Sequence, residues 1–292
     1  METNAAAERV LVGEGRTAEI LEWDEGRVLR LYRLGASLGT VQRELRAFRC
    51  ASEAGVPSPA VYPSDTGDGL IEVDGRLGIV MERISGPTML RQLTQRPWKL
   101  WSYARLLADL HHSMHQQSSI TLPSQRERFH IVIDQLSGQL DPKLLALLHQ
   151  TLDRLDDGNA ICHGDFHPDN VILSDRGPVI IDWGPASAGA PAADVAWTVY
   201  LFKHGGTPPG MSRGQRVVLS TLRRLFLKSY CRNYMRLSSM RQRMIKQWAP
   251  VIAAIRLGDG IPEEEEGLLQ TLRTFEARQV RRSRQRHADR GV

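Results

Sequence analysis

Three oxygen-bearing side chains occur in order within one segment of the chain, at Asp165, Asn170 and Asp182. Between Asn170 and Asp182, two short runs rich in β-branched residues, 171–173 and 178–181, flank an Asp-Arg-Gly turn, which predicts a β-hairpin. Such a hairpin brings the residues before its first strand and after its second strand to the same end. Phosphoryl transfer needs a base near the attacking hydroxyl and oxygen ligands for Mg²⁺, so these three side chains suit that chemistry.

The sequence at both ends of this hairpin resembles a known family. His163-Gly-Asp165 with Asn170, followed by Ile181-Asp-Trp-Gly184, is similar to the catalytic loop and the metal-binding motif of the aminoglycoside phosphotransferase and choline kinase family. The resemblance implies that Asp165 is catalytic and that Asn170 and Asp182 hold Mg²⁺. The alternative is an Asp-rich turn in an unrelated α/β protein, and the ordered spacing of the motifs argues against it.

The same resemblance implies the architecture of the chain. We expect an α+β, two-lobed, protein-kinase-like fold with a small β-rich N-lobe, residues 1–84, that binds the nucleotide. A larger, mainly helical C-lobe, residues 85–292, would carry the catalytic loop and the acceptor site. ATP would lie between the lobes and give its γ-phosphate to a hydroxyl of a small molecule. An aminoglycoside, a macrolide, a choline-like amine or a sugar derivative would fit this scaffold, and the fold does not choose among them.

The first strands of the expected N-lobe contain two candidate phosphate-binding glycines. Residues 10–33 alternate between strand-like runs and turns, and Gly13 and Gly15 lie where the first run ends. The backbone N–H groups of a Gly-x-Gly segment suit contacts with phosphates, but Gly-rich hairpins without a ligand are common. We assign the two glycines to the nucleotide site because of the motifs that follow them.

Arg30 is the main departure from the family pattern. Apolar spacing predicts a helix over residues 35–54, in which Glu44 occupies the position of the helix-C Glu of kinase-like folds. The usual partner of that Glu is a Lys in the third strand, where this chain has Arg30. Arginine keeps the positive charge but presents a longer, planar group. Two functions remain open: an active phosphotransferase whose Arg30 and Glu44 position the α- and β-phosphates, or a nucleotide-binding pseudokinase without phosphotransfer.

A second predicted hairpin, with an Asp74-Gly75 turn, leads into the segment that resembles the linker between the lobes. By that resemblance Met81 would line the adenine pocket. The carbonyl of Glu82 and the amide of Ile84 would bond the adenine edge, so their side chains would be poor tests of function.

Three histidines, His111, His112 and His115, close an amphipathic helix that begins near Leu100. Two of them have the i, i+4 spacing of a metal site. No further ligand motif is joined to them, so we interpret them as a partly exposed helix end.

The segment after Asp182 is short. Eleven residues separate Asp182 from Asp194, whereas a protein kinase needs a longer segment there to form a peptide groove. This brevity favours a small-molecule acceptor over a protein substrate. By the resemblance, Asp194 would brace the catalytic loop; as an isolated residue it could equally be a helix N-cap.

Composition excludes several other classes. The net charge of +5 resides in the tail, residues 273–292, where seven Arg face Glu276 and Asp289. Residues 1–272 are therefore neutral overall, which argues against a nucleic-acid partner. No apolar run is long enough to cross a membrane, and we expect no secretory signal. Three cysteines without ligand spacing indicate reduced thiols and a cytoplasmic location. The oligomeric state is not predicted.

Overall fold

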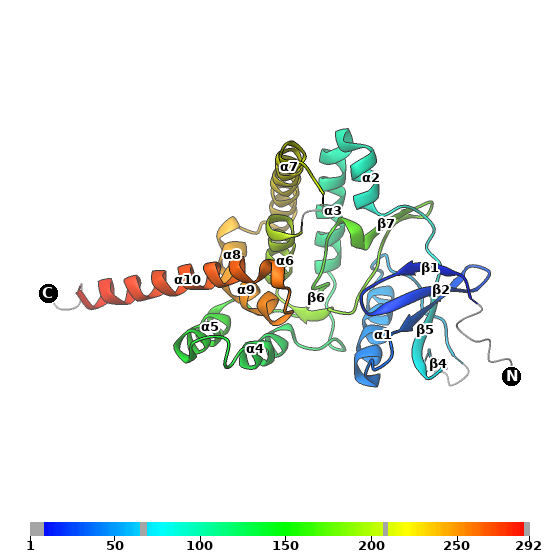
Figure 1. The fold of residues 1–292 in the computed structure, drawn as a ribbon, viewed down its shortest axis with the longest axis horizontal. Coiled ribbons are helices and arrows are strands. Elements are labelled where there is room, and N and C mark those ends of the chain that lie inside the picture. Colours follow the sequence, from blue (N-terminus) through cyan, green and yellow to red (C-terminus); the bar gives the residue numbers. More distant parts are fainter. Residues whose placement is uncertain (1–8, 65–68, 207–209, 289–292) are drawn as a thin grey trace.

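The structure is a computed structural model, which describes residues 9–64, 69–206 and 210–288. Figure 1 shows two lobes: a small β-rich lobe from the first part of the chain and a larger, mainly helical lobe from the rest. The long C-terminal helix extends away from the body on the side opposite the small lobe. This is the two-lobed α+β arrangement that the motifs predict.

The N-lobe is built on one five-stranded antiparallel sheet with the order β1-β2-β3-β5-β4. The strands are β1 (Leu11–Glu14), β2 (Ala18–Asp24), β3 (Arg27–Tyr32), β4 (Leu70–Val73) and β5 (Arg76–Glu82). Asp74 and Gly75 both adopt positive φ, 51° and 71°, as a tight hairpin turn between β4 and β5 requires. The predicted strands and this turn are confirmed.

Helix α1 (Leu38–Glu53) covers one face of the sheet and begins three residues later than its apolar spacing suggests. Gly35 has a φ of 86°, and the side chain of Ser37 accepts a hydrogen bond from the Thr40 N–H. The residues before Ser37 therefore form a turn, and Ser37 is the N-cap. The buried stripe of α1 includes Glu44, which directs this carboxylate into the protein instead of into solvent.

The remaining helices form the C-lobe. They are α2 (Met89–Gln95), the 3₁₀ turn η2 (Pro97–Lys99), α3 (Leu100–His115), α4 (Gln125–Gln135), α5 (Pro142–Arg154), α6 (Pro191–His204), α7 (Arg213–Ser238), α8 (Gln242–Gln247), α9 (Ala249–Gly258) and α10 (Pro262–Ala288). Helices α3 and α7 pack side by side, and α9 packs against α4, α6 and α10. None of the helices in the described part of the chain is long and apolar enough to cross a membrane.

Two small hairpin-like units hold the candidate catalytic residues. β7 (Val171–Ser174) pairs with β8 (Gly177–Ile180), and this is the hairpin predicted from the sequence. β6 (Ala160–Cys162) pairs with β9 (Ser187–Gly189), although 24 residues separate the two strands. The second pairing brings the loop after β6 next to the loop before β9.

A single main core connects the lobes. It contains buried residues of α1 and of the sheet, such as Phe48 and Ile79, together with C-lobe residues such as Leu107 and Trp183. A smaller cluster of Leu21, Leu29, Leu31 and Val80 covers the other face of the sheet. The three cysteines are free, and burial raises the pKa of the Cys162 thiol, which confirms Cys162 as a core residue.

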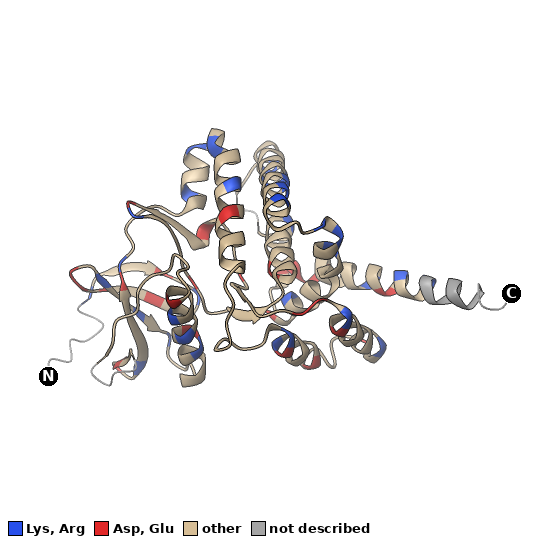
Figure 2. Ribbon diagram, turned by 180° about the vertical axis from the view of Figure 1, so that it is seen from behind, with Lys and Arg blue, Asp and Glu red and all other residues tan. Residues whose placement is uncertain are grey.

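Charge is unevenly distributed along the helices (Figure 2). Lys and Arg occur along α7, which has no Asp or Glu, whereas α4 and α5 carry both signs. Residues 1–272 are therefore neutral in total net charge although they include a basic helix, α7.

Candidate active site

Asp165 and Asn170 lie in one loop between β6 and β7, and Asn170 holds the loop in shape. The Nδ2 group of Asn170 donates to the backbone carbonyl of Asp165 at 2.9 Å and contacts its Oδ2 at 3.4 Å. The short 3₁₀ turn η3 (Pro168–Asn170) buries Asn170, and His167 caps this turn. Because its amide nitrogen faces Asp165, the Oδ1 of Asn170 remains available to a cation.

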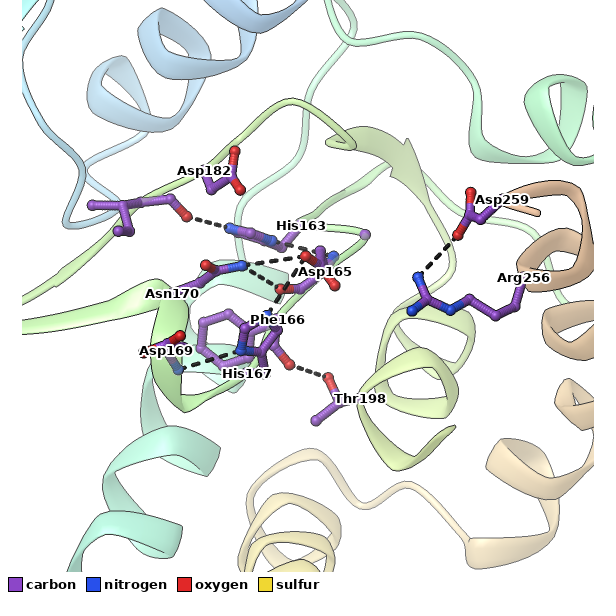
Figure 3. Close-up of polar contacts among 12 residues, drawn as sticks. His163, Asp165, Phe166, His167, Asp169, Asn170, Asp182, Thr198, Arg256 and Asp259 are labelled. Carbon is purple, nitrogen blue, oxygen red and sulfur yellow. Dashed lines mark hydrogen bonds and ion pairs between the residues drawn. The ribbon is translucent and has the colours of Figure 1, made fainter. Parts of the chain in front are cut away.

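Asp182 follows β8, and the hairpin brings it to the same place. The N–H of Ile181 donates to the carbonyl of Asn170 at 3.0 Å, and Nε2 of His163 contacts the Ile181 carbonyl at 3.0 Å. Figure 3 shows Asp165, Asn170 and Asp182 arranged around His163. Asp182 has a φ of 65°, an uncommon conformation for a residue other than glycine. The convergence predicted from the motifs is therefore present.

Asp194 holds the backbone of the catalytic loop. It is the fourth residue of α6 and is almost fully buried. Its two carboxylate oxygens accept hydrogen bonds from the backbone N–H groups of His163 at 2.7 Å and Gly164 at 2.8 Å. Gly164 has a φ of 76°, and a Cβ there would lie 2.6 Å from the carbonyl oxygen of Pro185. The bracing role is confirmed, and the N-cap alternative is wrong because α6 begins at Pro191.

Two buried histidines of α3 complete the environment of Asp194. Nε2 of His111 and Nε2 of His115 lie 3.1 and 3.2 Å from Asp194 Oδ2. Their Nδ1 atoms each lie 2.6 Å from a tyrosine hydroxyl of α7, Tyr230 for His111 and Tyr234 for His115. The interpretation of His111 and His115 as a partly exposed helix end is wrong, because both are buried between α3 and α7.

The hydrogen bonds among these residues explain the cluster of His111, His115 and Asp194 without a metal ion. The ligand-type atoms of His111, His115 and Asp194 lie within 4.8 Å of one another, a spacing that would suit a metal. However, both nitrogens of each histidine ring already have a hydrogen-bond partner, the Asp194 carboxylate at Nε2 and a tyrosine hydroxyl at Nδ1. Burial and the neighbouring His115 lower the pKa of His111 to about 3, so this ring is neutral. Burial opposes the ionisation of Asp194, but the two histidine hydrogen bonds outweigh it and hold its pKa well below the usual range.

Asp165 is ionised and a weak base. Burial alone would raise its pKa, but the hydrogen bond and charge of His167 outweigh burial, so the pKa lies below the ordinary value. His167 Nε2 is 3.6 Å from Asp165 Oδ2. The indole N–H of Trp197 also lowers this pKa.

Arg30 lies between two carboxylates from different lobes. One terminal nitrogen, Nη2, is 2.9 Å from Glu44 Oε1 and 3.0 Å from Asp182 Oδ1. The Tyr32 hydroxyl donates to the other oxygen of Glu44 at 2.6 Å. A Cβ at Gly184 would lie 3.5 Å from the same Glu44 oxygen, so the backbone after Asp182 is close to this carboxylate. The expected pairing of Arg30 with Glu44 is present and extends to Asp182.

The opposite charges of Arg30, Glu44 and Asp182 stabilise each other. Burial opposes the charge on Arg30, but Glu44 and Asp182 raise the pKa of its guanidinium, so Arg30 stays charged. Burial raises the pKa of Glu44, and the ion pair with Arg30 limits that rise. Nε of Arg30 is buried without a hydrogen-bond partner in the described structure. An unpartnered donor on this side chain suits an oxygen of a phosphate group.

The segment after β5 connects the lobes and contacts the catalytic hairpin. Gly86 has a φ of 145°, and a Cβ there would lie 2.4 Å from the carbonyl oxygen of Leu173 in β7, so only glycine fits. The Thr88 hydroxyl, at the N-cap of α2, donates to Asp169 at 2.8 Å. These contacts fix the position of the linker relative to the catalytic loop.

The remaining predicted residues lie in or near the N-lobe sheet. Met81 is buried near the end of β5, Glu82 is the last residue of that strand, and Ile84 follows in the linker. Gly13 lies in β1 opposite Ile20, and the Gly15 N–H donates to the carbonyl of Ala18 at 2.9 Å. The roles of these five residues in nucleotide binding stay predictions.

A large groove elsewhere is separate from these residues. It has a volume of about 1020 Å³ and lies between α5, α8 and α10, with Leu147, Lys246 and Phe275 in its lining. None of the predicted site residues lines it. The converging polar groups, and not this groove, form the candidate active site.

Sequence reasoning missed His167, Trp197 and the partners of His111 and His115. A usable signal was present: His111 and His115 are four residues apart, and so are Tyr230 and Tyr234. Matched i, i+4 pairs on two helices predict facing stripes. For His167, the usable sequence signal was its position two residues after Asp165.

Comparisons with known proteins agree with this geometry. A model of the phosphotransferase enzyme family matches residues 9–237. An aminoglycoside-3'-phosphotransferase of type VIII has 21% identity over 85% of this chain and 93% of its own, with a TM-score of 0.58. Amicoumacin kinase hAmiN, solved with AMP-PNP, Ca²⁺ and Ami, has 13% identity over 94% of this chain and 89% of its own, with a TM-score of 0.61. No curated protein matches the chain in the sequence comparison.

A further solved structure shows the same fold. A thermostable mutant of aminoglycoside phosphotransferase APH(4)-Ia, in a ternary complex with AMP-PNP and hygromycin B, has 16% identity over 92% of both chains and a TM-score of 0.61. The two lobes of this chain have the kinase-like fold of these solved structures. The chain belongs to the phosphotransferase enzyme family.

Proposed function

We propose that the protein transfers the γ-phosphate of ATP to a hydroxyl group of a small molecule, with Mg²⁺ as the cofactor. The observation that carries this proposal is that Asp165, Asn170 and Asp182 gather around His163 (Figure 3), while Nη2 of Arg30 lies 3.0 Å from Asp182 Oδ1. A cation and two oxygen donors face the place for the phosphates, and an ionised carboxylate faces the place for the acceptor.

The residues of the site fit Mg²⁺ and ATP. Asp182 offers a half-exposed carboxylate, and Asn170 offers an amide oxygen beside it; both are ligands that Mg²⁺ prefers. The buried, unpartnered Nε of Arg30 suits a phosphate oxygen. Bound Mg²⁺ would neutralise the negative charge that develops on the transferred phosphoryl group. Gly13 and Gly15 would cover the phosphates, and Met81 with the backbone of Glu82 and Ile84 would hold the adenine.

The main role of Asp165 would be to position the acceptor hydroxyl. It would take the proton only late in the reaction. Its pKa lies below the ordinary value, so the carboxylate accepts a hydrogen bond from the hydroxyl and takes the proton as the phosphoryl group arrives. Asn170 and the brace from Asp194 fix the carboxylate through the backbone. Most of the rate enhancement would then come from orientation and electrostatics.

We also propose the boundaries and the setting of this enzyme. The N-lobe would comprise residues 1–84 and the C-lobe residues 85–292, because the linker follows β5. The acceptor would be a small molecule of the aminoglycoside, choline or sugar type, and hygromycin B and streptomycin are bound by structural neighbours. A cytoplasmic location would fit the free cysteines and the use of ATP.

The test is a pair of measurements on Asp165→Asn and the wild type. An acceptor panel with mass detection of the phosphorylated product should identify a substrate for the wild type. With that substrate, the variant should lose roughly 10²-fold or more in turnover and keep its Mg²⁺-ATP affinity. An unchanged turnover in the variant would remove Asp165 as the catalytic residue.

The pseudokinase alternative rests on Arg30 in place of Lys. Its ion pair with Glu44 supports the active form, because Glu44 is the partner that a Lys would have at this position. Mg²⁺-ATP binding without turnover on any acceptor would favour the pseudokinase. Recovery of turnover in Arg30→Lys would then locate the defect at this residue.

A further inference from the structure

A second cluster of histidines and carboxylates connects α4 and α5, away from the proposed active site. His130 and Asp134 lie one turn apart on α4, and His149 and Asp153 lie one turn apart on α5. Each histidine reaches a carboxylate of the other helix. Nε2 of His130 is 3.1 Å from Asp153 Oδ1, and Nε2 of His149 is 2.9 Å from Asp134 Oδ1.

The two rings face each other through their remaining nitrogens. Nδ1 of His130 is 2.7 Å from Nδ1 of His149, and the ring planes are within 6° of parallel. Because each Nε2 faces a carboxylate oxygen, each Nε2 carries a hydrogen, which leaves a lone pair on Nδ1 of a neutral ring. Two lone pairs at this distance repel each other unless a cation lies between them.

We propose that His130 and His149 bind a divalent transition-metal ion of the zinc, nickel or copper type through their Nδ1 atoms. Asp134 and Asp153 carry two negative charges, so a divalent ion neutralises the cluster, whereas a single shared proton leaves one negative charge. A carboxylate on the far nitrogen of each ring is the arrangement that fixes a histidine for metal binding. Imidazole nitrogens favour these metals over Mg²⁺ and Ca²⁺.

The site needs only a small adjustment to admit the ion. At metal–nitrogen distances of about 2.0–2.1 Å and a tetrahedral angle, two ligand nitrogens lie about 3.3 Å apart. The side chains of His130 and His149 are 30% and 27% exposed, so both rings have room to separate from 2.7 Å to that distance. Water would fill the remaining coordination positions. The bound ion would join α4 to α5.

The experiment is a calorimetric titration of ZnCl₂ into chelator-treated, full-length protein in millimolar Mg²⁺. Mg²⁺ occupies oxygen-ligand sites, so the Zn²⁺ signal reports nitrogen ligands. We expect one Zn²⁺ per chain with micromolar affinity, lost in His130→Gln and in His149→Gln. Asp134→Asn and Asp153→Asn should each weaken the affinity by roughly 10–100-fold. His204→Gln, which changes a histidine on α6, should leave the affinity unchanged.

A second measurement keeps the proposal independent of how well the variants fold. Saturating Zn²⁺ should raise the melting temperature of the wild type by about 3 °C or more, and should leave that of His130→Gln unchanged. Circular dichroism should show the same helix content for both proteins. Absence of Zn²⁺ binding, or binding that survives both histidine substitutions, would overturn the proposal. If no Zn²⁺ binds, a shared proton alone lies between the two rings.

Discussion

The phosphate side and the acceptor side of the proposed active site are held together by different forces. On the phosphate side, Arg30 joins Glu44 and Asp182 by ion pairs across two lobes. On the acceptor side, Asp165 is fixed by the Asn170 amide and by backbone N–H groups that Asp194 holds. Ion pairs between lobes adapt when the lobes move, whereas a buried hydrogen-bond network is rigid. The phosphate side is therefore the adjustable half of the site, and the acceptor side is the fixed half.

The largest expected effect follows from breaking the fixed half. Asp194→Ala removes a buried carboxylate that accepts four hydrogen bonds, and it leaves the His163 and Gly164 N–H groups without partners. We expect the free energy of unfolding to fall by about 3–5 kcal/mol, measured by urea denaturation. A loss below about 1 kcal/mol would show that the network does not hold the loop.

Removing the cation from the adjustable half should affect ligand binding more than stability. Arg30→Met leaves Glu44 and Asp182 without their cation, so we expect Mg²⁺-ATP affinity to fall by roughly tenfold or more in calorimetry. Arg30→Lys is the matched control and should keep most of the affinity, since a Lys nitrogen carries the same charge. Equal affinity of wild type and Arg30→Met would separate Arg30 from the phosphates.

The fixed half should also make stability depend on pH. His111 has a folded pKa of about 3 against an unfolded value of 6.5, so the unfolded state binds more protons between these values. Stability should therefore be full above pH 6.5 and should fall as the pH is lowered towards 3, by about 1.4 kcal/mol per pH unit for this proton.

His111→Gln is the control for this pH dependence, because a Gln amide donates and accepts without titrating. Its denaturation curves should show a shallower loss of stability over the same pH range. An unchanged slope would assign the dependence to other groups, such as the Asp194 carboxylate, whose lowered pKa acts in the same direction at lower pH.

The smallest effect should come from the proposed adenine contact. Ile84 would bond adenine through its backbone amide, so Ile84→Ala should change ATP affinity by less than about threefold in the same titration. A loss above tenfold would mean that the side chain itself contacts the nucleotide.

Features that depend on residues close together in the chain were predicted correctly from the sequence. The Asp74-Gly75 turn, the β7–β8 hairpin and the order of Asp165, Asn170 and Asp182 depend on residues near each other in the chain. Such features follow from turn chemistry and from β-branched runs.

Contacts between distant segments were harder to predict. Asp182 is 152 residues from Arg30, and Tyr230 is 119 residues from His111. Helical spacing placed His111 and His115 on one face of α3 but did not show whether that face meets solvent or α7. The family resemblance supplied the Glu44 and Asp194 positions, because it carries tertiary information that periodicity lacks.

Asp182 and Asn170 are proposed to hold a divalent ion on a nucleotide bound near Arg30. The direct test is calorimetric titration of ATP into the wild type and Asp182→Asn, each with and without Mg²⁺. We expect Mg²⁺ to raise the ATP affinity of the wild type by about tenfold or more and to leave that of the variant unchanged. Equal ATP affinity of the wild type with and without Mg²⁺ would contradict the account.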